Sequence, residues 1–416
     1  MWRARRHACS SGPLTASTLG AVLVTESSVG ETADHDNSDF LIDRVAEASS
    51  SSRLIQVFAG STKRHCLPEC DATPLDMRSH RGIIDYQPSE LVVTARAGTP
   101  LQEVNALLAK ERQMLASTPP FRVYNPNAAI EGAATAGTAT VGGAVATGLS
   151  GPTRPFGGSL RDAVLGVEMI NGLGEHLRFG GQVIKNVAGY DVSRLQAGAW
   201  GGLGALLAIS LRVQPIWPCE TTVFLRYSPQ EAVSKLPRLR LKDWPLQSTV
   251  WHQGSLALRF AGQSSGVQQA VAALPSETKL EGKESALFWD DWRDQQTDFF
   301  RSDGDKRATG QRLWRLITPP AAPLPVIPSP GTPNPLVEES TFGSGWAMEW
   351  ANGLRWLWSN NADAVLDYAH QVGGWAWPIG GAMPVPAAQR QYMHAIKAAF
   401  DPHNVFASGL RFDHAD

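Results

Sequence analysis

The chain of 416 residues has little cysteine and little net charge. Its four cysteines, Cys9, Cys66, Cys70 and Cys219, have none of the spacings that hold an iron–sulfur cluster. A metal site or a disulfide at Cys66 and Cys70 is a minor alternative, and we predict no bound metal. Scarce cysteine favours a reducing compartment. A formal net charge of −2 gives no long-range field for nucleic acid, so no nucleic-acid partner is expected.

Long apolar runs and several catalytic motifs are also missing. The best membrane candidate, GALLAISLRV, falls well short of the roughly 20 residues that a spanning helix needs. No G-x-G-x-x-G, G-x-x-x-x-G-K-[ST] or H-E-x-x-H motif occurs. These absences weigh against a transmembrane segment, an NAD-type Rossmann domain, a Walker-type nucleotide site and a zinc hydrolase.

Residues 1–38 are predicted to lie outside the fold, as a disordered or targeting-like extension. The first 25 residues contain Arg3, Arg5 and Arg6, many serines and threonines, and no acidic residue before Glu26. That composition resembles a targeting segment, and a disordered tail or an overextended start fits it equally well.

Length and an apolar content of 43% predict two domains, 39–217 and 218–416. The first domain holds eighteen of the 39 glycines between positions 132 and 204. Twelve of the fourteen tryptophans lie between Trp217, at the boundary, and Trp377 in the second domain, which predicts an aromatic core or an interface. Within it, residues 318–335 contain eight prolines and are predicted to form an exposed, extended insert.

Local patterns predict individual elements within both domains. A strand at 91–97 precedes a helix whose start carries a capping box of Thr99 and Gln102. Residues 205–215 alternate apolar and polar side chains and predict a half-buried strand. The last helix is predicted to place Tyr392 on one side with other apolar residues.

Two loops have the composition of a phosphate cradle. The segment AGSTKRH, 59–65, follows a predicted strand and offers consecutive amides with the hydroxyls of Ser61 and Thr62. The segment TVGGAVATG, 140–148, is dense in glycine, which lets backbone approach a ligand closely. A set of tight turns is the alternative for the glycines alone.

The order of several segments resembles the FAD-binding family named for vanillyl-alcohol oxidase and p-cresol methylhydroxylase (PCMH-type). These segments are AGSTK, LVVTARAGTPL, TVGGAVATGLSGPTRPFGG, VIKNVAGYDVSRLQAGAWGGLGALLAISLRVQP and the terminal FDPHNVF. Within the family, HRGIIDYQPSELVVTARAGTPL and FGGSLRDAVLG are similar to the E subunits of glycolate oxidase (glycolate dehydrogenase). The resemblance covers residue 39 to the end and is weakest in the proline-rich insert. It implies an α+β fold, with a PCMH-type FAD-binding domain of two α/β subdomains followed by a second α+β domain.

The resemblance also implies which residues bind FAD. The diphosphate would lie between two loops, and the chain after the second loop would continue along the cofactor. The implied residues are Ala59, Gly60, Ser61, Thr62, Lys63, Thr140, Val141, Gly142, Gly143, Gly148, Gly151, Arg154 and Gly157, with Val183 and Ile184 packed against the cofactor.

Some family members bond the flavin covalently through a histidine or cysteine of the first loop. Here Ser61 follows Gly60 and His65 lies further along, so non-covalent FAD is expected.

The function implied by the resemblance is that of one subunit in a multi-subunit glycolate dehydrogenase. Such an enzyme oxidises glycolate, a small 2-hydroxy acid, to glyoxylate and passes electrons through flavin to an iron–sulfur partner subunit. This chain lacks cluster ligands, so the cluster would lie on that partner, and a sister FAD-binding subunit is the second expected partner. The implied location is cytoplasmic and peripheral to the inner membrane through partners, with organelle targeting left open by the basic start.

The catalytic residues stay unassigned by the sequence. Related flavoproteins carry an H-x-G-D-G-N-x-H segment, whose histidine serves as base, and this chain has none. Candidates for anchoring a carboxylate or the cofactor are Arg161, Lys185, Tyr190 and Arg411, and the isolated histidines are His252, His370, His394 and His403. Two alternatives therefore stay open. One is an FAD-containing assembly subunit without its own substrate site, and the other is a stand-alone flavin oxidase of sugars or alditols.

Overall fold

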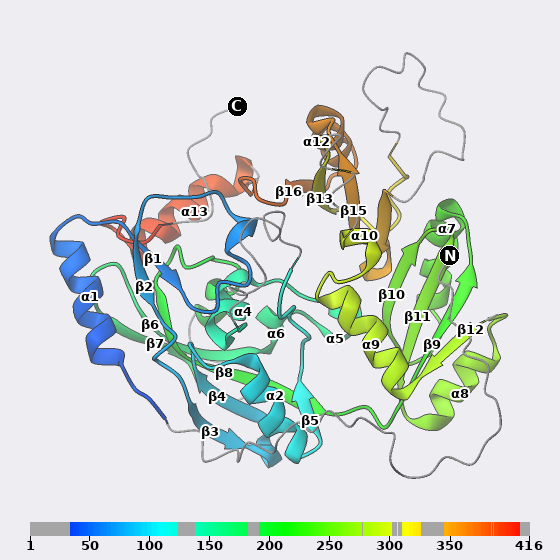
Figure 1. Cartoon of the computed structure of the whole chain (residues 1–416), viewed down its shortest axis with the longest axis horizontal. Helices are drawn as coiled ribbons and strands as arrows, with labels where there is room; N and C mark the ends of the chain where they lie inside the picture. Colours follow the sequence, from blue (N-terminus) through cyan, green and yellow to red (C-terminus); the bar gives the residue numbers. More distant parts are fainter. Residues whose placement is uncertain are drawn as a thin grey trace, which may run out of the picture. The chain divides into compact units, whose positions relative to one another are not determined.

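The computed structural model describes residues 34–123, 138–181, 191–276, 278–301, 306, 310–325, 345–383, 385 and 387–407. All of them belong to one compact unit that begins at residue 34. Most strands lie in two antiparallel sheets, drawn in blue to green and in green to orange (Figure 1). None of the described helices has the length and apolar character needed to cross a lipid bilayer.

The fold begins a few residues earlier than the sequence predicted. Arg96, almost buried in the first sheet, donates to the carboxylate of Asp34 at 2.7 Å and pairs with Asp36 at 3.0 Å. His35 forms an isolated bridge with Arg81. Residues 34–38 are therefore part of the fold, because a buried guanidinium needs carboxylate partners that this segment supplies.

The first sheet consists of β3 (Ile83–Gln87), β4 (Val92–Arg96), β8 (Ala205–Pro215), β6 (Val164–Ile170) and β7 (His176–Gly180) in this spatial order, with β5 (Gln113–Leu115) also paired to β8. The half-buried character predicted for 205–215 is wrong over most of its length. Residues 205–211 are all buried, because β4 and β6 pair with β8 from both sides. Even Ser210 is buried, and its hydroxyl hydrogen-bonds Thr94 at 2.8 Å.

Three helices pack near this sheet: α2 (Leu101–Lys110), α4 (Val141–Thr147) and α6 (Leu160–Ala163). The short helix α5 (Arg154–Gly157) instead contacts β10 (Leu246–His252) of the second sheet. The predicted capping box at the start of α2 is wrong. The N-cap is Pro100, while the Thr99 hydroxyl is buried and bonds both the amide and the carbonyl of Gly82 at 2.9 Å. A hydroxyl already used to join two segments cannot also cap the helix.

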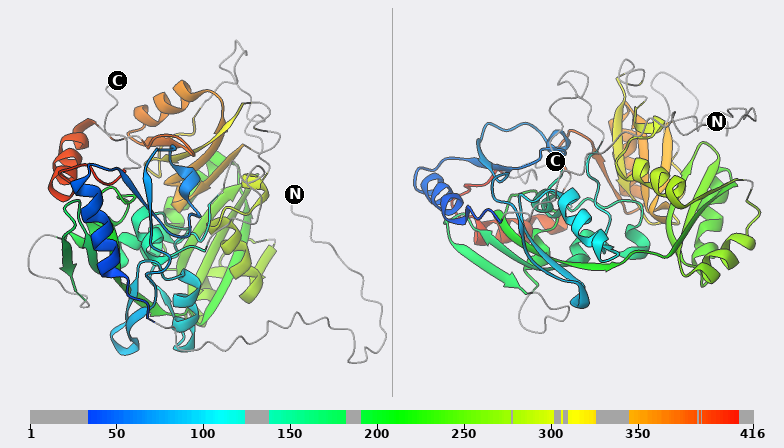
Figure 2. Two further views of the ribbon diagram at one scale, coloured as in Figure 1. Left: turned by 60° about the vertical axis from the view of Figure 1, so that its left-hand side comes forward. Right: turned by 60° about the horizontal axis from the view of Figure 1, so that its bottom comes forward.

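The parallel pair β1 (Ile55–Phe58) and β2 (Thr73–Asp76) lies beside α1 (Ser38–Ser50) and α13 (Ala387–Phe400), and η1 (Arg64–Cys66) connects the two strands (Figures 1 and 2). The C-terminal segment pairs with β1, since Ile55 donates to Val405 and Ala407 donates to Ile55, both at 2.8 Å. On α13, Tyr392 is exposed rather than packed, which corrects the predicted apolar side of this helix.

The second sheet has the spatial order β12 (Thr278–Glu281), β9 (Cys219–Arg226), β11 (Ser255–Gly262), β10 (Leu246–His252), β14 (Trp346–Glu349), β15 (Leu354–Ser359), β13 (Arg312–Ile317) and β16 (Trp375–Pro378). Its helices are α7 (Pro229–Arg240), α8 (Ser264–Ala272), α9 (Gly282–Arg293), α10 (Asp298–Arg301) and α12 (Ala362–Gln371).

The chain passes from the first sheet to the second between Pro215 and Cys219. The domain boundary at 217/218 stays a prediction, because the last described residues return to β1.

The predicted aromatic core is confirmed in this second sheet. The side chains of Trp289, Trp292, Phe299, Phe300 and Trp356 are buried together, with edge-to-face ring pairs such as Phe300 on Trp356 at 5.3 Å. Such pairs add to the burial of large apolar surface. The aromatic side chains thus fill the space between this sheet and helices α9 and α10.

The start of the proline-rich segment departs from the exposed insert that was predicted. Ala322 is buried, and its carbonyl accepts a hydrogen bond from Arg355 at 2.6 Å. The Pro323 carbonyl accepts another from Arg355 at 2.7 Å. Since Arg355 is wholly buried, these carbonyls satisfy donors on both of its terminal nitrogens and fix residues 322–323 to the sheet. Positions 326–335 of the predicted insert lie outside the described residues.

Candidate functional site

A cavity lies where the two predicted cradle loops meet. It is lined by residues 59–63 of the first loop, by Thr140, Gly142 and Gly143 of the second, and by Trp200 and Gly201 from a third segment. The structure therefore brings together eight of the predicted cofactor-binding residues around one cavity.

The first loop presents free amide donors. Ser61 follows β1 and Gly60 with a left-handed φ of 54°. Within the described part of the chain, the amides of Gly60, Ser61 and Thr62 donate to no other residue. Consecutive amides in a tight turn form a concave site for an anion. The loop can thus bind a phosphate group through backbone rather than through side-chain charge.

The glycines themselves have a different role from the one that sequence suggested. A Cβ at Gly60 would lie 1.7 Å from the Thr138 carbonyl oxygen, and one at Gly142 would lie 2.7 Å from the Ala97 Cβ. The Gly142 amide donates to the Ala97 carbonyl at 2.8 Å, so it is not available to a ligand. These glycines let three chain segments approach one another, and amide contact with a ligand falls to the first loop.

Helix α4 starts at the cavity wall and explains the remaining second-loop residues. The hydroxyl of Thr140, the N-cap, accepts from the Gly143 amide at 3.2 Å. Val141 is fully buried in the core of the first sheet. Gly148 ends the helix in the left-handed region with φ 61°, a conformation that glycine adopts without steric cost. Val141 and Gly148 therefore support the cavity wall without lining it.

Lys63 carries the cationic group of the first loop and is almost fully buried. Its ammonium donates to the Thr62 hydroxyl at 3.1 Å and to the Phe121 carbonyl at 3.3 Å. Burial lowers the pKa of Lys63 to about 8, while nearby Cys66 and Asp294 act in the opposite direction. An anion in the cavity would favour the charged form of this lysine.

The residues predicted to continue along the cofactor lie further away. The Gly151 carbonyl accepts from the Trp350 indole at 2.9 Å, and the Arg154 guanidinium lies over the same ring at 4.5 Å. Arg154 and Gly157 line neither cavity described here. Val183 and Ile184, together with Lys185, Tyr190 and Arg411, lie outside the described residues. Arg161 is exposed, and its neighbour Asp162 instead accepts from Ser159 at 2.7 Å.

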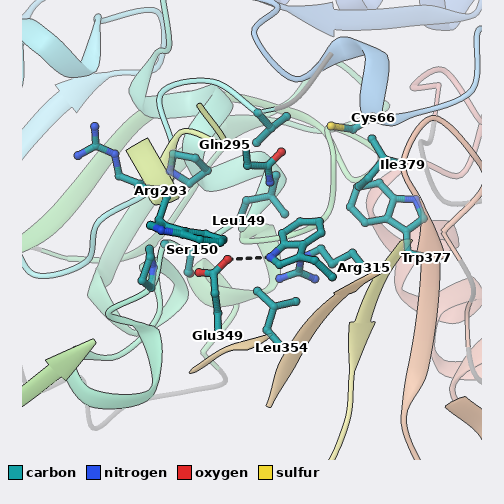
Figure 3. Close-up of a pocket in the computed structure, with 16 residues that line it drawn as sticks. Cys66, Leu149, Ser150, Arg293, Gln295, Arg315, Glu349, Leu354, Trp377 and Ile379 are labelled. Atoms are coloured by element: carbon teal, nitrogen blue, oxygen red, sulfur yellow. Dashed lines mark hydrogen bonds between the residues drawn. The ribbon is translucent and has the colours of Figure 1, made fainter. Parts of the chain in front are cut away.

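A second, smaller chamber is lined by residues of both halves of the chain and contains residues that sequence reasoning missed. Figure 3 shows Arg315 and Glu349 reaching into it from strands of the second sheet, with Cys66 and Leu149 on other walls. The Trp356 indole donates to Glu349 Oε1 at 2.7 Å. One signal was available, because Glu349 is an isolated acid within the aromatic run WAMEWANGLRWLW.

The isolated histidines of the second domain do not supply a catalytic base at this chamber. His252 Nδ1 lies 2.8 Å from the Trp346 carbonyl oxygen, and its ring packs against Trp292 and Phe299. Burial lowers the pKa of His252, which favours its neutral form. His403 Nδ1 hydrogen-bonds the Ser49 hydroxyl at 2.9 Å. His252 and His403 thus have structural partners.

Comparison with known proteins identifies the family. Residues 36–180 match the family described as FAD binding domain (FAD_binding_4). The chain is 35% identical over 382 residues to glycolate oxidase subunit GlcE of Escherichia coli (strain K12), covering 91% of this chain and 98% of that protein. The chain belongs to the GlcE family. This GlcE-family chain therefore contains a PCMH-type FAD-binding domain and has the α+β fold that its sequence predicted.

Other relatives of this GlcE-family chain match over shorter stretches. D-2-hydroxyglutarate dehydrogenase of Xanthomonas citri pv. viticola is 29% identical over 130 residues, which cover 31% of this chain and 25% of that protein. Glycolate oxidase subunit GlcD of Bacillus subtilis is 31% identical over 96 residues, covering 23% and 20%. A solved structure of alkyldihydroxyacetonephosphate synthase has a TM-score of 0.61 at 12% identity, over 91% of this chain and 75% of that chain. This last likeness concerns the fold alone.

The residues around the larger cavity fit a dinucleotide cofactor. Three amides that donate to no described residue and the Lys63 ammonium offer donors for a diphosphate, and Val57, Ala59 and Leu206 offer apolar walls. Pockets that combine a few fixed donors with apolar surface are typical of cofactor sites.

Proposed function

We propose that this chain is the FAD-binding subunit of a multi-subunit glycolate dehydrogenase, which oxidises glycolate to glyoxylate. The observation that carries the proposal is the cavity built by residues 59–63 and 140–143, in a chain that matches GlcE over almost its whole length. The relatives that match over shorter stretches are also named for 2-hydroxy acids, and this supports an acid of that class as substrate.

The chain's own residues bind and orient the cofactor in this proposal. The amides of Gly60, Ser61 and Thr62 hold the diphosphate, and Lys63 balances part of its charge. FAD supplies a two-electron acceptor when bound. Non-covalent attachment is supported by Ser61, because a hydroxyl at this position is not one of the histidine or cysteine groups that bond flavin. Val183 and Ile184 are proposed to pack against the cofactor.

We further propose two protein partners, a sister FAD-binding subunit and an iron–sulfur subunit that takes up the electrons. The support is that relatives bear the names of two different glycolate oxidase subunits, GlcE and GlcD. The proposed location is the cytoplasm, with attachment to the inner membrane through these partners. The relative that matches over most of its length is bacterial, which gives organelle targeting no support.

The first test is an anaerobic titration of the purified chain with glycolate, following the visible absorbance of the flavin. Acid precipitation beforehand should release FAD into the supernatant, as expected for non-covalent binding. Bleaching by glycolate would show that this chain has its own substrate site. A flavin that dithionite reduces and glycolate does not would favour the assembly subunit, and a preparation without flavin would refute the cofactor assignment.

A matched pair of variants tests the loop itself. Lys63→Met removes the buried ammonium beside the cavity and should lower the amount of FAD that stays bound during gel filtration. Lys235→Met removes an ammonium from the exposed surface of α7 and should leave the FAD content unchanged. Equal FAD content in the two variants would exclude Lys63 from the diphosphate site.

A further inference from the structure

Arg315 is a buried cation that has no hydrogen-bonding partner for its side chain among the described residues. Only 8% of the residue is exposed, and three indoles surround its guanidinium, with Trp350 at 5.0 Å, Trp375 at 5.9 Å and Trp356 at 6.0 Å. Among the described residues, no side chain or carbonyl accepts a hydrogen bond from it, and no ion pair reaches it. Buried donors in folded proteins are nearly always satisfied, so an unsatisfied guanidinium in a chamber indicates a missing acceptor.

Glu349 shares the chamber with Arg315 but does not pair with it. The residue is 3% exposed, and its Oε1 accepts from the Trp356 indole. The guanidinium can therefore use its planar pair of donors for another carboxylate, which is the geometry that arginine recognises best.

The two cavities are neighbours along the same segments of chain. Lys63 and Leu67 line the larger cavity, and Cys66 between them lines the smaller one. In the same way, Thr147 lines the larger cavity and Leu149 to Gly151 line the smaller one. A ligand in the smaller chamber would thus lie next to the proposed cofactor site.

We infer that the smaller chamber binds the carboxylate of a small hydroxy acid through Arg315, with Glu349 beside it as the group that holds a proton. This inference rests on the proposed function, and it adds the residues that recognise the substrate. Arg315 is a specificity-determining residue, because the neutral alcohols and alditols lack the carboxylate that satisfies its donors.

The titratable groups that line this chamber define how binding depends on pH. Arg315 on β13 and Arg293 on α9 are cationic, and Cys66 in η1 is a thiol whose pKa burial raises to about 12. Arg154 at α5 lies outside the chamber and helps to lower the pKa of Arg315. Burial raises the pKa of Glu349 to about 7 and lowers that of Arg315 to about 10. Between about pH 6 and 8, Glu349 is the group of this chamber that titrates. A bound anion favours its neutral form, so binding takes up a proton.

The test measures binding with inert probes by isothermal titration calorimetry on the purified full-length chain. Oxamate is a two-carbon anion with no C–H bond to oxidise, and acetamide is an uncharged molecule of similar size. Oxamate should bind and acetamide should not. Above about pH 7, oxamate affinity should fall by up to about tenfold per pH unit. Acid-released FAD is measured in the same preparations.

Variants assign the effect to residues. Arg315→Gln should weaken oxamate binding by about 10- to 100-fold, the range expected for hydrogen bonds to a charged group. Arg315→Lys should restore part of it, and thermal unfolding checks that each variant is folded. Glu349→Gln should bind oxamate with little dependence on pH. Arg238→Gln removes the same charge from the exposed surface of α7 and should bind like the unmodified chain.

The outcomes separate this inference from the proposed function. Equal oxamate affinity in Arg315→Gln and Arg238→Gln would overturn the inference, as would an unchanged pH dependence in Glu349→Gln. If the unmodified chain retains FAD but does not bind oxamate, the chamber assignment fails and the FAD-binding subunit stands. If oxamate binds through Arg315 but no FAD is present, the chamber stands and the cofactor assignment fails.

Discussion

Replacing Lys397 by methionine tests how α13 and the C-terminal segment are held on the first sheet. The Lys397 ammonium is buried with Asp401 as its ion-pair partner, and it also donates to the carbonyls of Gly202 at 2.7 Å and Phe406 at 2.9 Å. Asp401 is completely buried. Lys397→Met would leave a buried carboxylate without its countercharge, and breaking a buried pair in this way costs about 3–5 kcal/mol.

The assay is urea unfolding followed by tryptophan fluorescence, with the free energy of unfolding taken by linear extrapolation. The matched control is Lys235→Met, which removes the same group from an exposed pair of the same i,i+4 spacing with Glu231. We expect a loss of about 1 kcal/mol or less in that control, because an exposed ion pair and the contact of Lys235 with the Tyr227 ring at 4.2 Å each contribute little. Similar free energies of unfolding for the two variants would refute the reasoning.

Lys397→Met should also lower FAD retention. Lys397 donates to the Gly202 carbonyl, and Gly202 directly follows Trp200 and Gly201, which line the cavity.

Three further predictions concern the two cavities. Burial raises the pKa of Glu349 from 4.5 to about 7, so the stability associated with its neutral form is lost as pH rises through that range. The free energy of unfolding of Glu349→Gln should therefore rise relative to the unmodified chain between about pH 5 and 8, by up to about 3 kcal/mol, and a constant difference would contradict this. Gly60→Ala places a Cβ 1.7 Å from the Thr138 carbonyl oxygen and should destabilise the chain by about 3 kcal/mol in urea unfolding, whereas Gly181→Ala, with no atom within 4 Å, should not. Thr140→Val removes the N-cap acceptor of α4 and should cost about 1 kcal/mol in thermal unfolding, with an unchanged midpoint counting against the cap.

The local prediction of secondary structure succeeded where the physical cause is local. The strand predicted at 91–97 and the helix after it are present as β4 (Val92–Arg96) and α2 (Leu101–Lys110). The predictions failed where a distant partner decides the outcome. Thr99 does not cap α2 because it bonds Gly82, and Ser210 is buried because two strands cover β8.

The candidate site shows the same division. Residues 59–63 and 140–143 could be identified from composition and resemblance, because both loops carry their signature within a few residues. Arg315 and Glu349 could not be identified in this way. Arginine and glutamate are common residues, and their significance here depends on burial and on the absence of a described hydrogen-bonding partner for Arg315.

The sequence by itself determined the family, the FAD-binding domain and the two loops that meet at the larger cavity. These properties depend on short segments whose backbone chemistry is set by neighbouring residues. Only the tertiary structure decided why Gly60 and Gly142 are needed, which residues pair with Lys397, and that Arg315 and Glu349 share a chamber. Each of these depends on close packing between segments far apart in the chain, and such packing determines which charges lose their contact with water.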